Sequence, residues 1–209
     1  MSDHGGSGLN GSRRWLRPGD AVEELRWALL AGAVAAVPTE SSYGLATDPR
    51  SAQGVDRIHR IKHRARSQPL PVVAADLSQI EVLGVRVCDP AITWARCRWP
   101  AALSVLVQPR RPLPAMCGAD RLAVRIPGHA DLRALLTALG FALTATSANR
   151  SQSSPILDPA ELVPLISGED VWVIDGGVLP GGLPSTMVGW REDQPQVLRK
   201  GRWSESVSE

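Results

Sequence analysis

Short apolar segments alternate with amphipathic helical segments along almost the whole chain. Residues 33–40 (AVAAVPTE) predict a short buried strand, and residues 121–128 (RLAVRIPG) alternate between apolar and polar positions as a strand does. Residues 20–31 carry apolar positions at helical spacing. This interleaving predicts a single α/β domain. Proline-rich strand starts and a terminal hairpin over residues 185–201 favour a mixed parallel and antiparallel sheet over a purely parallel one.

Capping and turn residues suggest where several elements begin and end. Asp20 is the predicted N-cap of the first helix, which we expect to run to about Ala31. Residues 39–51 are expected to form a loop after the first strand, and residues 141–149 (FALTATSAN) a strand that ends in a polar turn. The prolines in residues 69–76 (PLPVVAAD) predict a strand that lies at a sheet edge or starts irregularly.

The two ends of the chain differ in composition from its middle. We expect residues 1–17, rich in Gly and Ser, to form a flexible tail, residues 18–202 to form the domain, and residues 203–209 to form a C-terminal tail. No apolar run approaches the roughly 20 residues that a membrane helix needs. The opening residues have no apolar segment behind their charges, so we expect no signal peptide.

Positive and negative charges nearly cancel over the 209 residues. The 23 Lys and Arg against 21 Asp and Glu leave a net charge of +2, too small to give the whole molecule the field of a nucleic-acid-binding protein. Functional positive charge must therefore be local. The cysteines are odd in number and lack metal-ligand spacing, so we expect neither disulfides nor a zinc site, and a reducing cytoplasm fits best. They are Cys88, Cys97 and Cys117.

Residues 57–66 (RIHRIKHRAR) concentrate five basic side chains without one acid. On a helical wheel, Lys62 lies about 20° from Val55, on the face that Val55 buries, whereas Arg64 projects near the opposite side. A lone lysine in this position would snorkel past the core or cap the last helical carbonyls. Here several cations crowd one helix end beside a strand start, so an anion-binding site is the favoured interpretation.

Hydroxyl and amide side chains gather where predicted strands end, which is where open α/β sheets bind ligands. The alternative is that they form only Asx or Ser/Thr turns. Arg125 shares a strand face with Ala123, opposite the clearly buried face, so its default position is the solvent side. The polar strand ends are VPTESSYGL with Thr39 and Tyr43, TATSAN with Ser147 and Asn149, and GGLPSTM with Ser185.

Several familiar catalytic patterns are missing from the sequence. There is no GxxxxGK[ST] phosphate loop and no GxGxxG dinucleotide fingerprint. Without a histidine that has a suitable neighbour, we expect no Ser-His-Asp or Cys-His arrangement. A reaction here would then rely on holding polyanions in line rather than on a covalent intermediate. The histidines are His4, His59, His63 and His129.

Six motifs follow one another in a specific order: VPTESSYGLATD, IKHR with QPL after it, LAVRIP, TSAN, LPST and VLRKG. In this order and spacing the chain resembles the YrdC-like threonylcarbamoyl-adenylate synthases, over about residues 20–202. The resemblance implies a twisted α/β sheet around a deep, positively lined cavity. It implies a nucleotidyltransferase that condenses L-threonine, bicarbonate and ATP to threonylcarbamoyl-AMP and pyrophosphate. The product would serve the threonylcarbamoyladenosine modification of tRNA.

The resemblance also implies roles for individual residues on the nucleotide side. Lys62 and Arg64 would hold the phosphates of ATP. Ser147 and Asn149 would line the nucleotide and carbamate site, and these four residues would carry the catalysis. Magnesium would be held through the ATP phosphates and not by protein side chains.

The remaining implied positions divide between threonine and the nucleotide. Arg125 would bind the threonine carboxylate, with Thr39 and Ser185 gripping the rest of the amino acid. The resemblance assigns three further nucleotide-side residues, namely Gln68, Arg121 and Arg199.

Three positions depart from the family pattern, which leaves the amino-acid acceptor open. Ser41 stands where a second threonine is usual, Ala65 follows the lysine motif in place of a proline, and Gln152 replaces a glycine. Alternative readings are an RNA-binding module that uses the same cavity, a carbamoyl-adenylate-forming relative that acts on another acceptor, and a nucleotide-binding relative without turnover. Expected partners beyond the substrates are tRNA or tRNA-modifying proteins, and no membrane.

Overall fold

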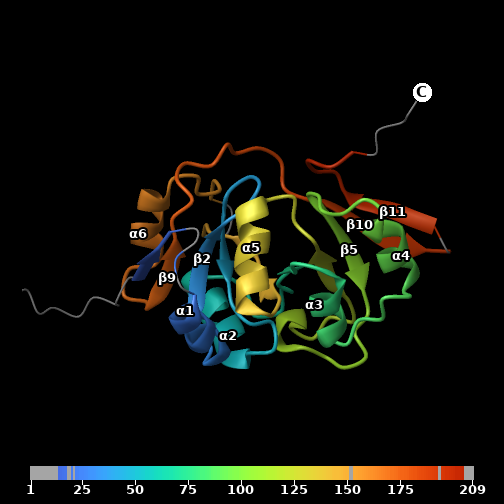
Figure 1. Ribbon diagram of the computed structural model, residues 1–209, viewed down its shortest axis with the longest axis horizontal. Helices are drawn as coiled ribbons and strands as arrows, with labels where there is room; N and C mark the ends of the chain where they lie inside the picture. The colour runs from blue at the N-terminus through green and yellow to red at the C-terminus, as the bar shows by residue number, and fades with distance from the viewer. Residues whose placement is uncertain (1–13, 18–19, 21, 151–152, 193, 205–209) are drawn as a thin grey trace, which may run out of the picture.

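Two mixed β-sheets surrounded by helices form the body of the protein (Figure 1). The computed structural model describes residues 14–17, 20, 22–150, 153–192 and 194–204. Their order along the chain confirms the predicted α/β class and the mixed sheet topology, but the strands form two sheets and not one.

The five-stranded sheet has the order β1-β9-β2-β3-β8. Strands β1, β9 and β2 are parallel neighbours, whereas β3 runs antiparallel to both β2 and β8. In β2 every residue is buried, as its continuous apolar run predicts. The bounds are β1 Arg14–Leu16, β2 Val34–Pro38, β3 Tyr43–Ala46, β8 Thr146–Ser147 and β9 Val171–Ile174.

The six-stranded sheet has the order β11-β10-β5-β6-β4-β7. The pairs β10–β5 and β6–β4 are parallel, and the other three neighbouring pairs are antiparallel. The predicted C-terminal hairpin is present as β10 and β11. The bounds are β4 Val72–Val73, β5 Leu103–Val107, β6 Leu122–Arg125, β7 Leu143–Thr144, β10 Thr186–Arg191 and β11 Gln194–Arg199.

Six α-helices and two short 3-10 helices connect the described strands. Their starts follow the side chains that can accept hydrogen bonds from free backbone N–H groups: Ser51 caps α2 through Gly54 N, and Asp89 caps α4 through Ala91 N. The bounds are α1 Glu23–Leu30, α2 Ala52–Ile61, α3 Leu77–Val82, α4 Pro90–Arg96, α5 Ala130–Leu139 and α6 Leu162–Leu165, with 3-10 helices at Pro114–Met116 and Pro159–Glu161.

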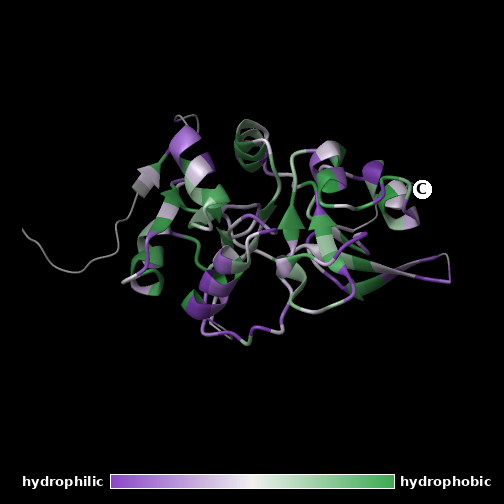
Figure 2. Cartoon of the chain, turned by 90° about the horizontal axis from the view of Figure 1, so that it is seen from below, coloured by the Kyte–Doolittle hydropathy of each residue, from purple (hydrophilic) through white to green (hydrophobic). Residues whose placement is uncertain are grey.

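Apolar side chains from both sheets form two connected layers of core. One layer packs α1 and α5 against the five-stranded sheet, with Leu29, Leu136 and Trp172 among its buried members. The other layer joins α2 to both sheets. Figure 2 shows the resulting distribution, with hydrophobic strands in the middle of the molecule and a hydrophilic outer end of the β10–β11 hairpin.

Residues 141–149 were predicted to form one strand, and this is wrong. The segment forms β7, which pairs with β4 in one sheet, and then β8, which pairs with β3 in the other. Ala145 lies between them and its N–H donates to the Pro71 carbonyl. The chain therefore passes from one sheet to the other at this point, and it carries Ser147 and Asn149 to the junction of the sheets.

Four other boundaries differ from the expectation. Helix α1 is capped at Val22 and not at Asp20, because the Asp20 carboxylate accepts the backbone N–H of Arg17 instead. Strand β3 occupies part of the predicted loop. Strand β4 is limited to Val72–Val73 and begins after both prolines, inside its sheet, so the irregular start holds of the two predicted alternatives and the sheet edge does not. Strand β1 shows that the sheet already includes residues 14–16, within the predicted N-terminal tail.

Candidate anion-binding site at the junction of the two sheets

A cavity of about 330 Å³ lies where the two sheets meet. Its wall combines the loop after β2, the start of β3, the crossing segment at β8, the end of β6 and the approach to β10. Six of the residues to which the family resemblance assigns a binding role line this cavity. They are Thr39, Arg64, Arg125, Ser147, Ser185 and Arg199.

Arg64 enters the cavity because helix α2 ends before it. The helix stops at Ile61, Lys62 is its C-cap, and His63 takes a left-handed conformation with φ of 48°. The helical-wheel prediction for Arg64 is therefore wrong, since the wheel applies only while the helix continues. The guanidinium donates to Thr146 Oγ1 at 3.4 Å and to Gln68 Oε1, and burial lowers its pKa.

Lys62 is buried behind the cavity wall, with 3% of its surface exposed, as the helical wheel predicted. Its ammonium donates to the carbonyl oxygens of Ser147 and Asn149 and to Asn149 Oδ1, the last two at 2.7 and 3.3 Å. The pKa of Lys62 is lowered to about 8. Burial is the largest cause, and the charge of Arg64 is the second. Lys62 thus fastens the crossing segment to the end of α2.

Ser147 and Asn149 form a polar turn in the segment that Lys62 contacts. Ser147 Oγ donates to Asn149 Oδ1, and Asn149 Nδ2 donates to the carbonyl of Ser153. Ser147 is exposed and lines the cavity, whereas Asn149 lies just beyond it and does not. Gln152 lies outside the described residues.

Arg125 was expected by default on the solvent side of β6, and this is wrong. Only 12% of its side chain is exposed, because the strand lies inside the six-stranded sheet and its second face is covered as well. Its Nη1 lies 3.0 Å from Glu40 Oε2, and Glu40 Oε1 accepts the N–H of Gly128 at 2.8 Å. Burial lowers the pKa of Arg125, and Glu40 opposes that change.

Hydroxyl groups complete the wall on both sides of Arg125. Thr39 is buried and donates to the Ser42 carbonyl at 2.8 Å. Ser185 Oγ shares a hydrogen bond of 3.0 Å with Ser104 Oγ. Arg199 donates to the Ser185 carbonyl at 2.9 Å, and its pKa is lowered by burial and then by the charge of Arg125.

Arg121 and Gln68 do not line the cavity. Arg121 precedes β6, at the opposite end of the strand from Arg125, and reaches the Trp190 carbonyl at 3.5 Å. Gln68 is exposed and touches the site only through Arg64. The sequence analysis did not name Glu40 as a site residue. Its position directly after Thr39, in a loop that carries a family motif, was the signal that could have identified it.

His59 and Cys117 meet, against the expectation that no Cys-His arrangement exists. Their Nε2 and Sγ atoms are 3.3 Å apart, from residues 58 positions distant in the chain. Burial lowers the pKa of His59 and raises the pKa of Cys117. Both shifts favour neutral imidazole and neutral thiol, so this pair lacks the thiolate that a cysteine nucleophile needs.

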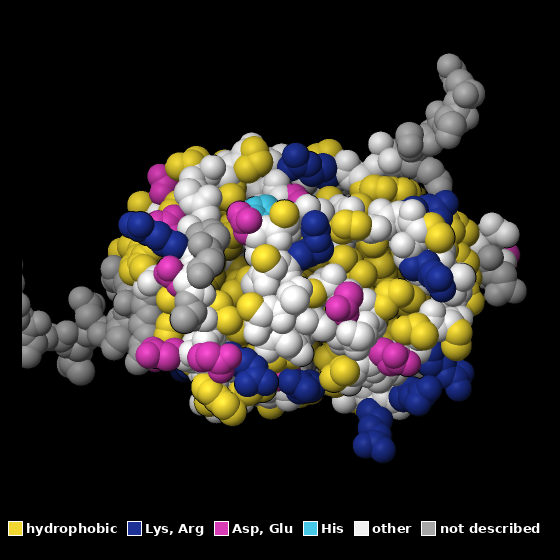
Figure 3. All heavy atoms as spheres, viewed as in Figure 1, with side chains coloured by type: hydrophobic (Ala, Val, Ile, Leu, Met, Phe, Trp, Pro, Cys, Tyr) yellow, Lys and Arg dark blue, Asp and Glu magenta, His cyan; other side chains and the backbone are white. Residues whose placement is uncertain are grey.

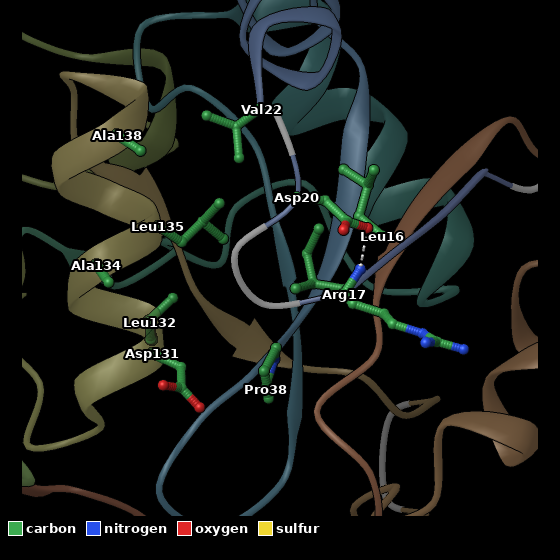
Figure 4. A pocket seen from close by; sticks show the side chains of 11 residues that line it. Leu16, Arg17, Asp20, Val22, Pro38, Asp131, Leu132, Ala134, Leu135 and Ala138 are labelled. Carbon is green, nitrogen blue, oxygen red and sulfur yellow. Dashed lines mark hydrogen bonds between the residues drawn. The ribbon is translucent and has the colours of Figure 1, made fainter.

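A second hollow, of about 410 Å³, lies between α5 and the segment that joins β1 to α1 (Figure 4). Leu135 and Val22 face one another across it, and most of the other lining groups are apolar. Its acids, Asp20 and Asp131, outnumber its one arginine. It therefore lacks the excess of positive charge that an anionic ligand requires.

Charge is dispersed over one face of the molecule. On the face shown in Figure 3, basic and acidic side chains occur side by side and not as one basic field. Among the described residues, no helix is long and apolar enough to cross a membrane, and no three potential His, Cys, Asp or Glu ligands gather as a metal site.

Fold and site together define an α/β protein whose cavity at the junction of two sheets is lined by arginines and hydroxyls, groups that suit a small anion. The chain belongs to the Sua5/YciO/YrdC family, whose sequence model, described as telomere recombination, matches residues 27–201. It is 33% identical over 171 residues to a threonylcarbamoyl-AMP synthase of Neisseria gonorrhoeae, which covers 80% of this chain and 90% of that protein.

A threonylcarbamoyl-AMP synthase of Bacillus subtilis is 32% identical over 171 residues, and here the chain spans 49% of the relative's length. Among solved structures, P. abyssi Sua5 with two substitutions superposes with a TM-score of 0.80 at 27% identity, over 91% of this chain and 61% of that one. P. abyssi Sua5 complexed with L-threonine gives a TM-score of 0.78 at 28% identity, over 91% and 57%.

Proposed function

We propose that the chain is a threonylcarbamoyl-AMP synthase, a nucleotidyltransferase that joins L-threonine, bicarbonate and ATP and releases pyrophosphate. The observation that carries this proposal is the convergence of Arg64, Arg125 and Arg199 with hydroxyl groups on one cavity between the sheets. Relatives that bear this name, and the relative solved with L-threonine, support the choice of substrate.

The proposed chemistry brings two anions together. Bicarbonate gives CO₂ with loss of water, and the amine of threonine takes up the CO₂ and releases a proton to become a carbamate. A carbamate oxygen then attacks the α-phosphorus of ATP while pyrophosphate leaves. Because both reactants are negatively charged, the site must first offset their repulsion, which cations in a partly buried cavity do. Holding the two in line supplies the rest of the rate enhancement.

Each cation suits one of these anions. Arg125 has the paired donors that match a planar carboxylate, and we assign the carboxylate of threonine to it. Arg64, at the end of α2, is assigned to the phosphates. Lys62 would act on the same end of the cavity through the turn that it fastens, formed by Ser147 and Asn149. ATP would enter as its magnesium complex, with the metal bound through phosphate oxygens.

The hydroxyl groups complete the proposed assignments. Thr39 and Ser185 would contact threonine beside Arg125, with Ser41 also on the cavity wall. Arg199 would approach the nucleotide from β11. We propose a reducing compartment, the cytoplasm, for this activity, because the three cysteines are free thiols and two of them are exposed.

The test is direct detection of threonylcarbamoyl-AMP by mass spectrometry, with threonine, bicarbonate, ATP and magnesium each omitted in turn. We expect product only in the complete mixture. ATP–pyrophosphate exchange with other amino acids and amines then identifies the acceptor, and a better acceptor than threonine would replace the proposed substrate. RNA affinity that falls steeply with salt, without any product, would favour the RNA-binding alternative instead. The transfer to tRNA would be tested by supplying the product to candidate partner proteins.

A further inference from the structure

Arg125 lies between the cavity on one side and an acid on the other. Its side chain belongs to the cavity wall, while Glu40 faces a separate hollow near Gly128 and Arg202. Both members of the ion pair are largely buried, with 12% and 13% of their side chains exposed. The positive charge of Arg125 is therefore balanced before any ligand arrives.

The two other arginines of the cavity are not balanced in this way. Arg64 contacts neutral oxygens of Thr146 and Gln68, and Arg199 contacts the neutral oxygens of Ser185. Within the described part of the chain, no ion pair with an acid forms at either residue. The cavity thus has one neutralised cation and two open ones.

We propose that Glu40 is a positioning residue that sorts the two anionic substrates, making Arg125 a receptor for a single carboxylate and leaving polyphosphate to the open cations. This inference rests on the proposed function and deepens it. Glu40 acts through Arg125, since it touches the guanidinium and does not line the cavity.

The sorting follows from Coulomb's law. A ligand carboxylate carries one negative charge, which Glu40 repels. Short, paired hydrogen bonds to the guanidinium offset this repulsion. A polyphosphate carries several charges, so Glu40 repels it several times more strongly, while its larger hydration shell also has to be removed. Polyphosphate therefore gains more at Arg64, where no neighbouring acid opposes it.

Glu40 also fixes the direction of the guanidinium. The N–H of Gly128 holds Glu40 Oε1, and Arg202 donates to the Glu40 backbone carbonyl, so the carboxylate is anchored at both ends of its residue. Arg125 Nη1 lies 3.0 Å from Oε2 of this anchored acid, an ion-pair contact in which Oε2 accepts no hydrogen bond from the described part of the chain. The guanidinium is planar, so this contact sets the orientation of its remaining donors.

The experiment measures inorganic pyrophosphate binding to the full chain by calorimetry, with and without L-threonine. In the unmodified protein we expect pyrophosphate and threonine to bind together without competition, and competition between them would overturn the proposal. In Glu40→Gln we expect pyrophosphate affinity to rise about tenfold, or about 1.4 kcal/mol, and pyrophosphate to compete with threonine. Adding Arg125→Met to Glu40→Gln should remove the gain in pyrophosphate affinity, because it removes the cation that Glu40→Gln leaves unpaired.

Two variants separate sorting from general effects of charge and of folding. Glu169→Gln also removes one acid, which precedes β9 and pairs with Arg57 and Arg60 of α2. Glu169 does not line the cavity, so we expect unchanged pyrophosphate affinity. Glu40→Asp keeps the charge and shortens the side chain, so the KM for threonine should rise without tighter pyrophosphate binding. Unchanged pyrophosphate affinity in folded Glu40→Gln would show that Glu40 does not sort the anions. An equal gain in Glu169→Gln would show a general effect of lost negative charge, and either result would overturn the proposal.

The pyrophosphate titration without threonine contains no amino acid, so the result of that arm is independent of the identity of the acceptor. Tighter pyrophosphate binding in Glu40→Gln together with absent threonine turnover in the unmodified protein would overturn the proposed function alone. Normal threonine turnover in the unmodified protein, with the same pyrophosphate affinity in that protein and in Glu40→Gln, would overturn the Glu40 proposal alone.

Discussion

The cations at the two ends of the cavity have different partners. At the end of α2, Lys62 and Arg64 contact only neutral oxygens, from Ser147, Asn149, Thr146 and Gln68. At the end of β6, Arg125 contacts the carboxylate of Glu40. The first end has spare positive charge for a polyanion, whereas the second has its charge balanced and its geometry fixed.

The difference shows that a site for two anions needs more than a number of cations. An unbalanced buried cation attracts any anion, and most strongly the one with the highest charge. A balanced cation selects by shape, through paired hydrogen bonds to a planar carboxylate. Four substitutions test this contrast between the ends.

The largest effect is expected at the balanced end. Arg125→Met leaves the Glu40 carboxylate buried without its cation, which should lower the free energy of unfolding by about 3 kcal/mol and abolish threonine binding. Urea denaturation and calorimetry with threonine measure the two effects. The matched double variant Arg125→Met with Glu40→Gln should recover stability but not threonine binding. Full stability of Arg125→Met alone would mean that the ion pair contributes nothing.

At the open end, Arg64→Ala removes a cation from the cavity wall without leaving a buried acid. We expect the KM for ATP to rise roughly tenfold to a hundredfold, as for a lost charge-assisted hydrogen bond, with little change in stability. Steady-state kinetics with ATP and with threonine varied separately measure this. An equal rise in the KM for threonine would argue against a division of the cavity into two ends.

Lys62 should give the open end a pH-dependent stability. Its pKa is about 8 in the folded protein, against an ordinary value of 10.5. Between these values the unfolded chain binds more protons than the folded chain, so the free energy of unfolding should rise with pH from about 8 to about 10.5. Urea titrations across this window measure the rise, and the same series on Lys62→Met should lack it. A parallel rise in both proteins would assign it to another group.

The smallest effect is expected at Arg121. Arg121→Ala removes a charge that the family resemblance assigns to the nucleotide but that the structure places at the far end of β6. The KM for ATP should change by less than about twofold, since a solvent-exposed charge outside the cavity contributes little. A tenfold rise would restore the assignment from the resemblance.

Much of this molecule could be predicted from local patterns. The apolar run of β2 and the C-terminal hairpin both lie where the sequence suggested, because a residue and its near neighbours decide them. The inward position of Lys62 also followed from helical periodicity. Six cavity residues came from ordered motifs in the resemblance and not from any single pattern.

Other features depended on contacts between distant segments. The direction of Arg64 follows from the left-handed His63, and the division of residues 141–149 between two sheets follows from the partners that each half finds. His59 and Cys117 meet only because α2 packs against the turn after Met116.

The amino-acid sequence by itself determined the α/β class, several of the strands and helices and which residue types gather at their ends, because backbone preferences and the burial of apolar faces act over a few residues. Only the tertiary structure decided that Arg125 is buried and paired with Glu40, and that Arg64 turns into the same cavity. The reason is physical: burial and electrostatic pairing depend on distances in space, and the folded chain brings together groups that are far apart along it.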